Sequence, residues 1–133
     1  MKILIIMATV VLNGCAVYDA FMMAPYDPNE YKLITEVRVD AEFYRSQCDN
    51  PLLALGNAQA IAAKTNLFEK YQEMIPRNNN GYQAAKALNE MTQGLSTQYT
   101  KNTSVSTVFC RLKYNTIEKS AESIQRTTAG RPR

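Results

Sequence analysis

The stretch over residues 27–48 reads DPNEYKLITEVRVDAEFYRSQC and decides how this chain folds. Asp27 is a good helix N-cap, and Pro28 suits the first helical position, where a backbone N–H has no partner within the helix. Apolar side chains then recur every three or four residues, which is the period of one face of an α-helix. They are Tyr31, Ile34, Val37, Ala41, Tyr44 and Cys48. The stretch therefore predicts one amphipathic helix, ended by Asp49-Asn50-Pro51.

Three more segments further along the chain show the same period. They cover residues 53–75, 82–99 and 105–124. Pro76 stops the first of the three, for which Gly56-Asn57 is an alternative start. The run Asn78-Asn79-Asn80-Gly81 is a turn by composition and leads into the next segment. Residues 103–107 also favour a short β-strand, which is the alternative to helix at that point.

Four helices of ~20 residues with short loops favour an all-α, antiparallel up-down four-helix bundle, because short connections make sequential helices antiparallel neighbours. The cysteines agree with this topology. Cys48 ends the first helix and Cys110 begins the fourth, and these two places share one pole of such a bundle. The sequence therefore predicts one Cys48–Cys110 disulfide closing a loop of about 60 residues, with two buried free thiols as the alternative.

The first fifteen residues have the character of an export signal. Lys2 precedes an apolar run over residues 3–12, which has the length of a signal-peptide core and is shorter than the ~20 residues that span a bilayer. Leu12-Asn13-Gly14-Cys15 follows at once and resembles the lipobox of bacterial prolipoproteins, although Asn13 departs from the small residue usual there. The resemblance implies cleavage between Gly14 and Cys15 and lipidation of the Cys15 thiol.

Together with the predicted helices and the Gly- and Pro-containing end of the chain, the resemblance gives a domain organisation, and by itself it implies a location. Residues 1–14 are the signal peptide, 15–27 a lipidated tether, 28–126 the helical bundle and 127–133 a disordered basic tail. Diacylglycerol and an acyl chain at Cys15 hold the protein to a membrane. Ala16 is not the Asp that retains such lipoproteins in the inner membrane, so the implied location is the outer membrane, facing the periplasm. An inner-membrane anchor is the alternative.

Two other interpretations of the N-terminus stay open. The first is an uncleaved signal anchor over residues 3–24. Asp19 argues against it, since an acidic group inside a spanning helix costs roughly 2.5 to 3.5 kcal/mol. The second is ordinary cleavage after Ala20 or Ala24, which removes Cys15 and releases a soluble periplasmic protein.

Composition excludes several kinds of chemistry. The chain has no histidine, which removes Ser-His-Asp and Cys-His catalysis and the usual zinc sites, and no cofactor or metal is predicted. It has no Gly-rich phosphate loop, and a net charge of +3 is too small for a dedicated nucleic-acid protein. Paired carboxylates are the remaining enzymatic option, yet their four-residue spacing is that of a solvated helix face. The candidates are Glu36, Asp40 and Glu42, and Glu69 with Glu73.

Positive charge is concentrated towards the C-terminus. From residue 101 onward there are seven Lys and Arg and two Glu, or +5, whereas residues 15–100 hold seven basic and ten acidic residues, or −3. The basic end is a candidate contact for anionic lipid, lipopolysaccharide, peptidoglycan carboxylates or an acidic partner, and a solvated helix with a frayed tail explains the same numbers. The candidate contacts are Lys113, Arg126, Arg131 and Arg133.

As a whole, the chain resembles small helical lipoproteins that large tailed phages encode. The resemblance lies in Pro25-Tyr26-Asp27-Pro28-Asn29-Glu30-Tyr31 and in Phe109-Cys110-Arg111-Leu112-Lys113. It implies a task at the host envelope, such as superinfection exclusion or assistance at lysis, and supplies no catalytic residues. We therefore expect a non-enzymatic interaction or structural lipoprotein with an envelope protein or the cell wall as its partner. A cell-wall-active enzyme or lysis factor that uses the paired carboxylates is the alternative.

Overall fold

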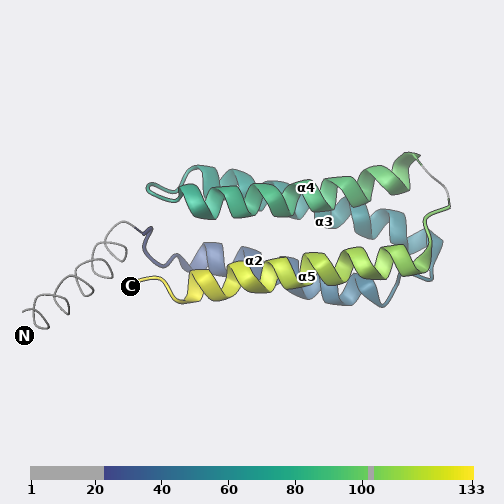
Figure 1. Cartoon of the computed structure of the whole chain (residues 1–133), viewed down its shortest axis with the longest axis horizontal. Coiled ribbons are helices and arrows are strands. Elements are labelled where there is room, and N and C mark those ends of the chain that lie inside the picture. The colour runs from purple at the N-terminus through teal and green to yellow at the C-terminus, as the bar shows by residue number, and fades with distance from the viewer. Residues whose placement is uncertain (1–22, 102–103) are drawn as a thin grey trace, which may run out of the picture.

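The computed structural model describes residues 23–101 and 104–133, and four helices run up and down through them (Figure 1). They are α2 (Pro28–Arg45), α3 (Pro51–Glu73), α4 (Asn79–Lys101) and α5 (Thr107–Ala129). No strand occurs within these two ranges. The predicted all-α bundle is thus confirmed. The predicted signal peptide, its cleavage site at Gly14 and Cys15, and the tether up to residue 22 lie outside the described residues.

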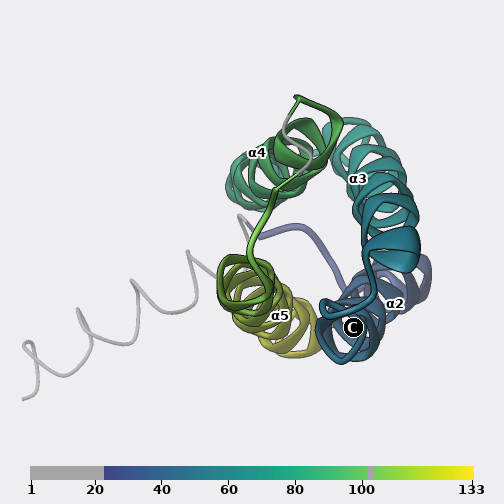
Figure 2. The ribbon, with the colours of Figure 1, turned by 90° about the vertical axis from the view of Figure 1, so that its right-hand side faces the viewer.

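Viewed along its axis, the bundle is a ring of four helices (Figure 2). Each helix contacts the next one in sequence, and α5 closes the ring by packing along α2. The closest pairs are α3 with α4 and α2 with α5. The bundle therefore consists of two helix pairs, one formed by sequence neighbours and one by the first and last described helices.

Local sequence explains where the helices begin. Asp27, Asn50 and Ser106 each precede a helix, and the side-chain oxygen of each accepts a hydrogen bond from a backbone N–H of the first turn. Because Asn50 and the following Pro51 form a complete start signal, α3 begins earlier than the predicted Leu53 or Gly56. The fourth helix starts at Thr107, after its cap, rather than at residue 105.

The start of α4 also differs from the prediction. Asn79, Asn80 and Gly81, which were expected in a turn, form the first helical positions of α4. The turn is therefore confined to the residues just before, where Arg77 has a φ of 57°. The left-handed conformation at Arg77 therefore lies just before the stretch that was predicted as the turn.

The core lies inside the ring and consists of the apolar faces that the helical period predicted. Burying each large aliphatic or aromatic side chain contributes ~1.5–3 kcal/mol relative to exposing it. The largest fully buried apolar side chains are Ile34 and Val37 of α2, Ile61 and Phe68 of α3, Leu88 and Leu95 of α4, and Tyr114 and Ile117 of α5.

The predicted disulfide is confirmed. Cys48 and Cys110 are joined with their Cα atoms 5.8 Å apart. Because α2 ends at Arg45, Cys48 lies in the turn after α2 rather than in its last helical turn, and the disulfide bonds this turn to the first turn of α5. We call this end of the bundle the disulfide pole. The opposite end, where α2 begins and α5 ends, is called the tether pole.

The last residues of the chain are ordered, which corrects the prediction of a disordered tail over residues 127–133. α5 continues to Ala129, and the Arg131 side chain is only 5% exposed. The backbone N–H of Tyr26 donates to the Pro132 carbonyl oxygen at 2.8 Å. The tail is held because a buried acid on α2, Glu30, binds Arg131.

Candidate functional site at the tether pole

A buried ion pair lies at the tether pole. Arg131 Nη1 donates to Glu30 Oε2 at 2.6 Å, and the Glu30 side chain is fully buried. Thr128 Oγ1 donates to the other carboxylate oxygen of Glu30 at 3.1 Å. A buried charge is tolerated only when it is paired and hydrogen-bonded, so Glu30 and Arg131 depend on each other. The pair joins the first turn of α2 to the C-terminal tail.

The hydrogen bonds continue from this pair into the turn between α3 and α4. Arg131 Nη2 donates to Asn78 Oδ1 at 2.9 Å, and Asn78 Nδ2 donates to the side chain of Gln72 and to its carbonyl oxygen. Gly81 leaves room for this contact. A Cβ atom at Gly81 would overlap the Asn78 side chain and lie 2.8 Å from Arg131 Nη2. The network therefore links three segments that are distant in sequence.

Residues 23–27, the described part of the predicted tether, are attached to the same region. Ala24 is buried, and the Arg133 guanidinium lies 4.8 Å from the centroid of the Tyr26 ring. Tyr71 of α3 donates its hydroxyl hydrogen to Asp27 Oδ2 at 2.5 Å. These contacts fix the point at which the chain enters the bundle.

Asp27 is stabilised as a carboxylate by its surroundings. Burial alone raises the pKa of Asp27, but hydrogen bonds from Tyr71 and from the backbone N–H groups of Asn29 and Glu30 outweigh it and lower the pKa. The charge of Arg131 acts in the same direction. The hydrogen bond to Asp27 also raises the pKa of Tyr71, so the proton stays on the tyrosine.

A cavity of about 460 Å³ opens beside the network. It lies between the start of α4 and the end of α5, and Met23 and Ala24 of the tether complete its wall. Asn78 and Arg131 of the network belong to its lining, together with Ile124 of α5. Amide, hydroxyl, guanidinium and aliphatic groups thus meet here, a mixture suited to binding rather than to proton transfer.

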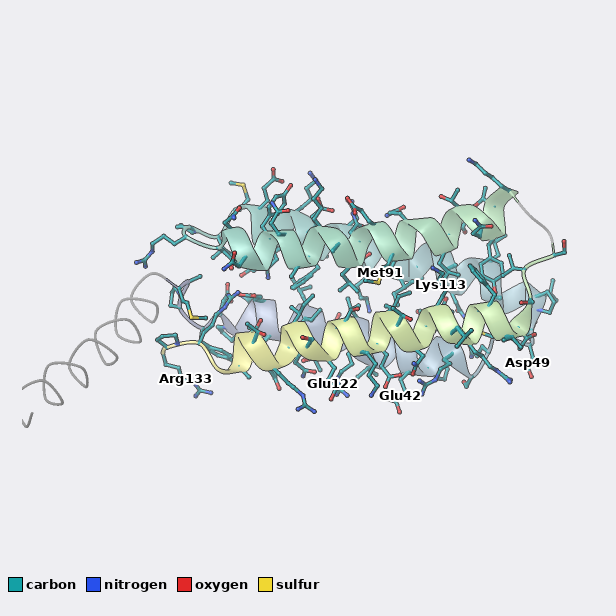
Figure 3. All side chains as sticks on the ribbon, viewed as in Figure 1. Glu42, Asp49, Met91, Lys113, Glu122 and Arg133 are labelled. Carbon is teal, nitrogen blue, oxygen red and sulfur yellow. A yellow bond between two sulfur atoms is a disulfide. The ribbon has the colours of Figure 1, made fainter. Side chains whose placement is uncertain are left out.

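Two of the three candidate acidic residues on α2, Glu36 and Asp40, form surface ion pairs with α3. Lys64 Nζ lies 2.5 Å from Asp40 Oδ2 and 3.6 Å from Glu36 Oε2. Burial lowers the pKa of Lys64, but the hydrogen bond to Asp40 and the nearby carboxylates outweigh this and raise it. Glu42 is exposed and points away from the bundle (Figure 3).

The acids on α3 are held in a similar way. Glu69 accepts a hydrogen bond from Asn89 Nδ2 at 2.5 Å, and Glu73 lies 3.4 Å from Lys70 Nζ on the same helix. Neither belongs to the lining of the cavity. The arrangement is that of polar contacts between and along helices.

The four basic residues predicted to contact anions do not form one patch. Lys113 Nζ stacks 5.4 Å from the Phe109 ring centroid near the disulfide pole, and Figure 3 shows it far from Arg133. Arg126 pairs with Glu122 at 2.6 Å. Arg131 is corrected from an exposed contact to a buried partner of Glu30. Along α5, the positions of Lys113 and Arg126 are separated by ~20 Å at 1.5 Å per residue.

Sequence analysis missed the Glu30–Arg131 pair, although a signal was present. Glu30 lies four residues before Ile34 and seven before Val37, on the face of α2 that enters the core. An acid on a buried stripe needs a cationic partner. That partner, Arg131, was not identified because it lies in the tail that was predicted to be disordered.

Neither a metal-binding group of acidic and cysteine side chains nor a helix long and apolar enough to cross a membrane occurs in residues 23–101 and 104–133. Comparison of the chain with protein-family models, with curated proteins and with solved structures gives no match.

Proposed function

We propose that this chain is a lipoprotein of the outer membrane, facing the periplasm, that acts as a non-enzymatic interaction or structural module of the cell envelope. The observation that carries the proposal is the fixed attachment of the tether to one pole. The backbone N–H of Tyr26 donates a hydrogen bond to Pro132, and the Tyr71 hydroxyl donates one to Asp27. The chain that leads from Cys15 therefore enters the bundle at a defined end.

This attachment suits a protein that presents one end of its body to a partner. Helices of 23 residues extend ~34 Å at 1.5 Å per residue, so the disulfide pole lies well away from the tether. Acyl chains on Cys15 contribute ~0.8 kcal/mol per buried methylene, which makes such an anchor durable. An anchored body of this kind is compatible with a host-envelope task of a phage-encoded protein, such as superinfection exclusion or assistance at lysis.

The ion pairs of the acidic residues favour this proposal over an enzyme. A glycosidase needs one carboxyl group with a raised pKa facing a second across a cleft. Asp40 instead contacts Lys64, and Glu73 contacts Lys70. Incubation of the purified protein with peptidoglycan is expected to release no fragments. Release that is lost in Asp40→Asn or Glu69→Gln would favour the enzymatic alternative.

Lipidation is tested by the intact mass of the full chain extracted from membranes. We expect the mass of residues 15–133 plus diacylglycerol and one acyl chain, with an increase of about two mass units on reduction of the disulfide. Cys15→Ser is expected to lose the acyl groups and membrane association. The matched control is the Cys48→Ala/Cys110→Ala double variant, which should keep both.

Two results contradict the proposal. One is labelled palmitate that fails to enter the wild-type protein. The other is a Cys15→Ser protein that stays in the membrane at unchanged size. For the partner, a benzophenone amino acid placed at position 112, where Leu112 is exposed near the disulfide pole, should form a photocrosslink in cells with an envelope component.

A further inference from the structure

The outward side of α3 is apolar and uncharged over most of its length. Leu52 is 90% exposed and Leu67 is 57% exposed, and no charged residue occurs between Pro51 and Ala63. The exposed residues that share this side are Leu52, Gly56, Gln59, Ala60, Ala63 and Leu67. We call this set the α3 face. Its helical spacing of three and four residues makes it one continuous strip.

The order of residue types along the α3 face is nearly symmetric about its centre. About the midpoint between Gln59 and Ala60, Leu52 mirrors Leu67 and Gly56 mirrors Ala63. A two-fold symmetric interface requires residue i to contact residue j while j contacts i. Two antiparallel copies of α3 related by an axis at this midpoint meet that condition. Each Leu52 then lies beside a Leu67 of the other copy.

The middle of the strip allows the two helices to approach closely. Gly56 has open space on the outside, because a Cβ atom there would meet no atom within 4 Å. In the antiparallel register, Gly56 of one copy faces Ala63 of the other. Small residues at a helix crossing bring the two backbones together, while the leucines at the ends provide most of the apolar contact.

Charges just outside the strip agree with the same register. Lys70 lies one turn beyond Leu67 on the same side, and Asp49 precedes Leu52. These two exposed residues mirror each other about the same midpoint. Antiparallel copies therefore bring Lys70 of one copy near Asp49 of the other at both ends. A parallel arrangement would instead place Lys70 against Lys70.

We infer that the α3 face is a self-association surface, on which a second copy of this chain packs α3 antiparallel to α3 about a two-fold axis between Gln59 and Ala60. The exposed apolar residues of α5, Val108, Phe109 and Leu112, are less suited to this, because Arg111 and Lys113 among them give like charges. The inference does not depend on lipidation of Cys15.

A contact made by one helix from each copy is small. It falls below the ~1,200 Å² of standard interfaces, so we expect a dimer with a dissociation constant in the micromolar range or weaker. Confinement of the protein at a membrane raises its effective concentration and favours the dimer further.

Sedimentation equilibrium of the purified full chain in density-matched detergent tests the inference. Wild-type protein is expected to show a monomer–dimer equilibrium, and Leu67→Glu should raise the dissociation constant about tenfold or more. Leu112→Glu is the matched control, because Leu112 is 63% exposed on α5, and it should leave the constant unchanged. Circular dichroism verifies that each variant is folded.

The register is tested by exchanging charges. Leu52→Lys and Leu67→Glu should each weaken the dimer when made singly. In the double variant, the antiparallel register brings each introduced lysine next to an introduced glutamate, and the dissociation constant should return to within about threefold of the wild-type value. A parallel register places like charges together and makes the double variant the weakest dimer.

Three results would overturn the inference. They are a wild-type chain that stays monomeric at every concentration, a dimer that Leu67→Glu leaves intact, and a double variant that associates no more tightly than the single ones. Photocrosslinking in cells from a benzophenone amino acid at Leu67 gives an independent answer. A product of doubled mass, attached near Leu52, supports the inference, whereas a product with a different protein alone contradicts it.

Discussion

The two poles of the bundle are closed by different kinds of bond, yet both bonds lie at the ends of the contact between α2 and α5, with Cys48 just after α2 and Arg131 just after α5. At the disulfide pole, Cys48 is covalently bonded to Cys110. At the tether pole, Glu30 is bonded to Arg131 by a buried ion pair. Short turns already connect α2 to α3 and α3 to α4. The seam between α2 and α5 joins helices that are far apart in sequence, where loop closure costs the most entropy.

Contacts along the seam between the two poles follow the same logic. Arg45 of α2 pairs with Glu118 of α5 at 2.5 Å, and Gln125 donates to Thr35 Oγ1 at 2.8 Å. Polar contacts therefore hold α2 and α5 together at several positions between the two poles. The disulfide closes one end of the seam by constraining the unfolded chain, and the ion pair closes the other end by satisfying buried charges.

Removal of the disulfide should have the largest effect. The Cys48→Ala/Cys110→Ala variant is expected to lose about 4 kcal/mol in free energy of unfolding, because the unfolded chain regains the entropy of an open loop. Urea unfolding followed by circular dichroism measures this loss. Addition of a reductant should destabilise the wild-type protein by a similar amount and leave the variant unchanged. A loss of less than about 1 kcal/mol contradicts the role given to the disulfide.

Removal of the ion pair at the tether pole should have the second-largest effect on the free energy of unfolding. Arg131→Met is expected to cost about 3 kcal/mol in urea unfolding, because Glu30 keeps its buried position and loses its cation. Arg133→Ala is the matched control near the same pole, and removal of its contact with Tyr26 should cost about 0.5 kcal/mol. The double variant Glu30→Leu/Arg131→Met should recover much of the loss. Equal effects of Arg131→Met and Arg133→Ala would show that the pair is not the closing bond.

Alanine substitutions at two glycines of α4 distinguish the effect of the hydrogen-bond network from the effect of helix propensity. Gly81→Ala should destabilise the protein by about 2 kcal/mol, since the added methyl group displaces Asn78 and Arg131. Gly94→Ala places the same methyl group in open space and should stabilise α4 by about 1 kcal/mol. Thermal unfolding of the two variants should therefore shift in opposite directions. Stabilisation by both substitutions would mean that Gly81 is not needed for the contact.

The sequence predicted the disulfide pole better than the tether pole, for a physical reason. Once Cys15 is assigned to the lipid, only Cys48 and Cys110 remain to pair. For Glu30, by contrast, the sequence offers many basic residues as candidate partners. Its helical period indicated burial, but nothing local to Glu30 indicated that the partner would come from a tail rich in Gly, Pro and Arg.

The helices were predictable because their apolar period is a local property, whereas the details of their starts depended on caps. Asn50 and Pro51 were interpreted as a breaker of the first helix, although together they also start the next one. The α3 face was not predicted at all. Its apolar residues are exposed. Periodicity shows which residues share a face of a helix, but when two faces of α3 are both largely apolar it does not show which of them packs into the core.

The smallest effect concerns the hydrogen bond between Tyr71 and Asp27. Because the folded pKa of Asp27 lies below its ordinary value of 3.8, this carboxylate stabilises the fold above that pH and loses its contribution as the pH falls through the folded pKa. Tyr71→Phe keeps the ring and removes the donor. It should cost about 1 kcal/mol at pH 7, and the difference from wild type should shrink as the pH falls below 3.8 and through the lower folded pKa of Asp27.

Tyr99→Phe is the control for this pH dependence. Burial is the cause of the raised pKa of Tyr99, and no carboxylate contributes to it. The cost of Tyr99→Phe should therefore be the same at pH 3 and pH 7, measured by urea unfolding at both. If the cost of Tyr71→Phe were equally constant, the link between the tether and α3 would depend on packing of the Tyr71 ring. The charge on Asp27 would then have no part in holding the tether to its pole.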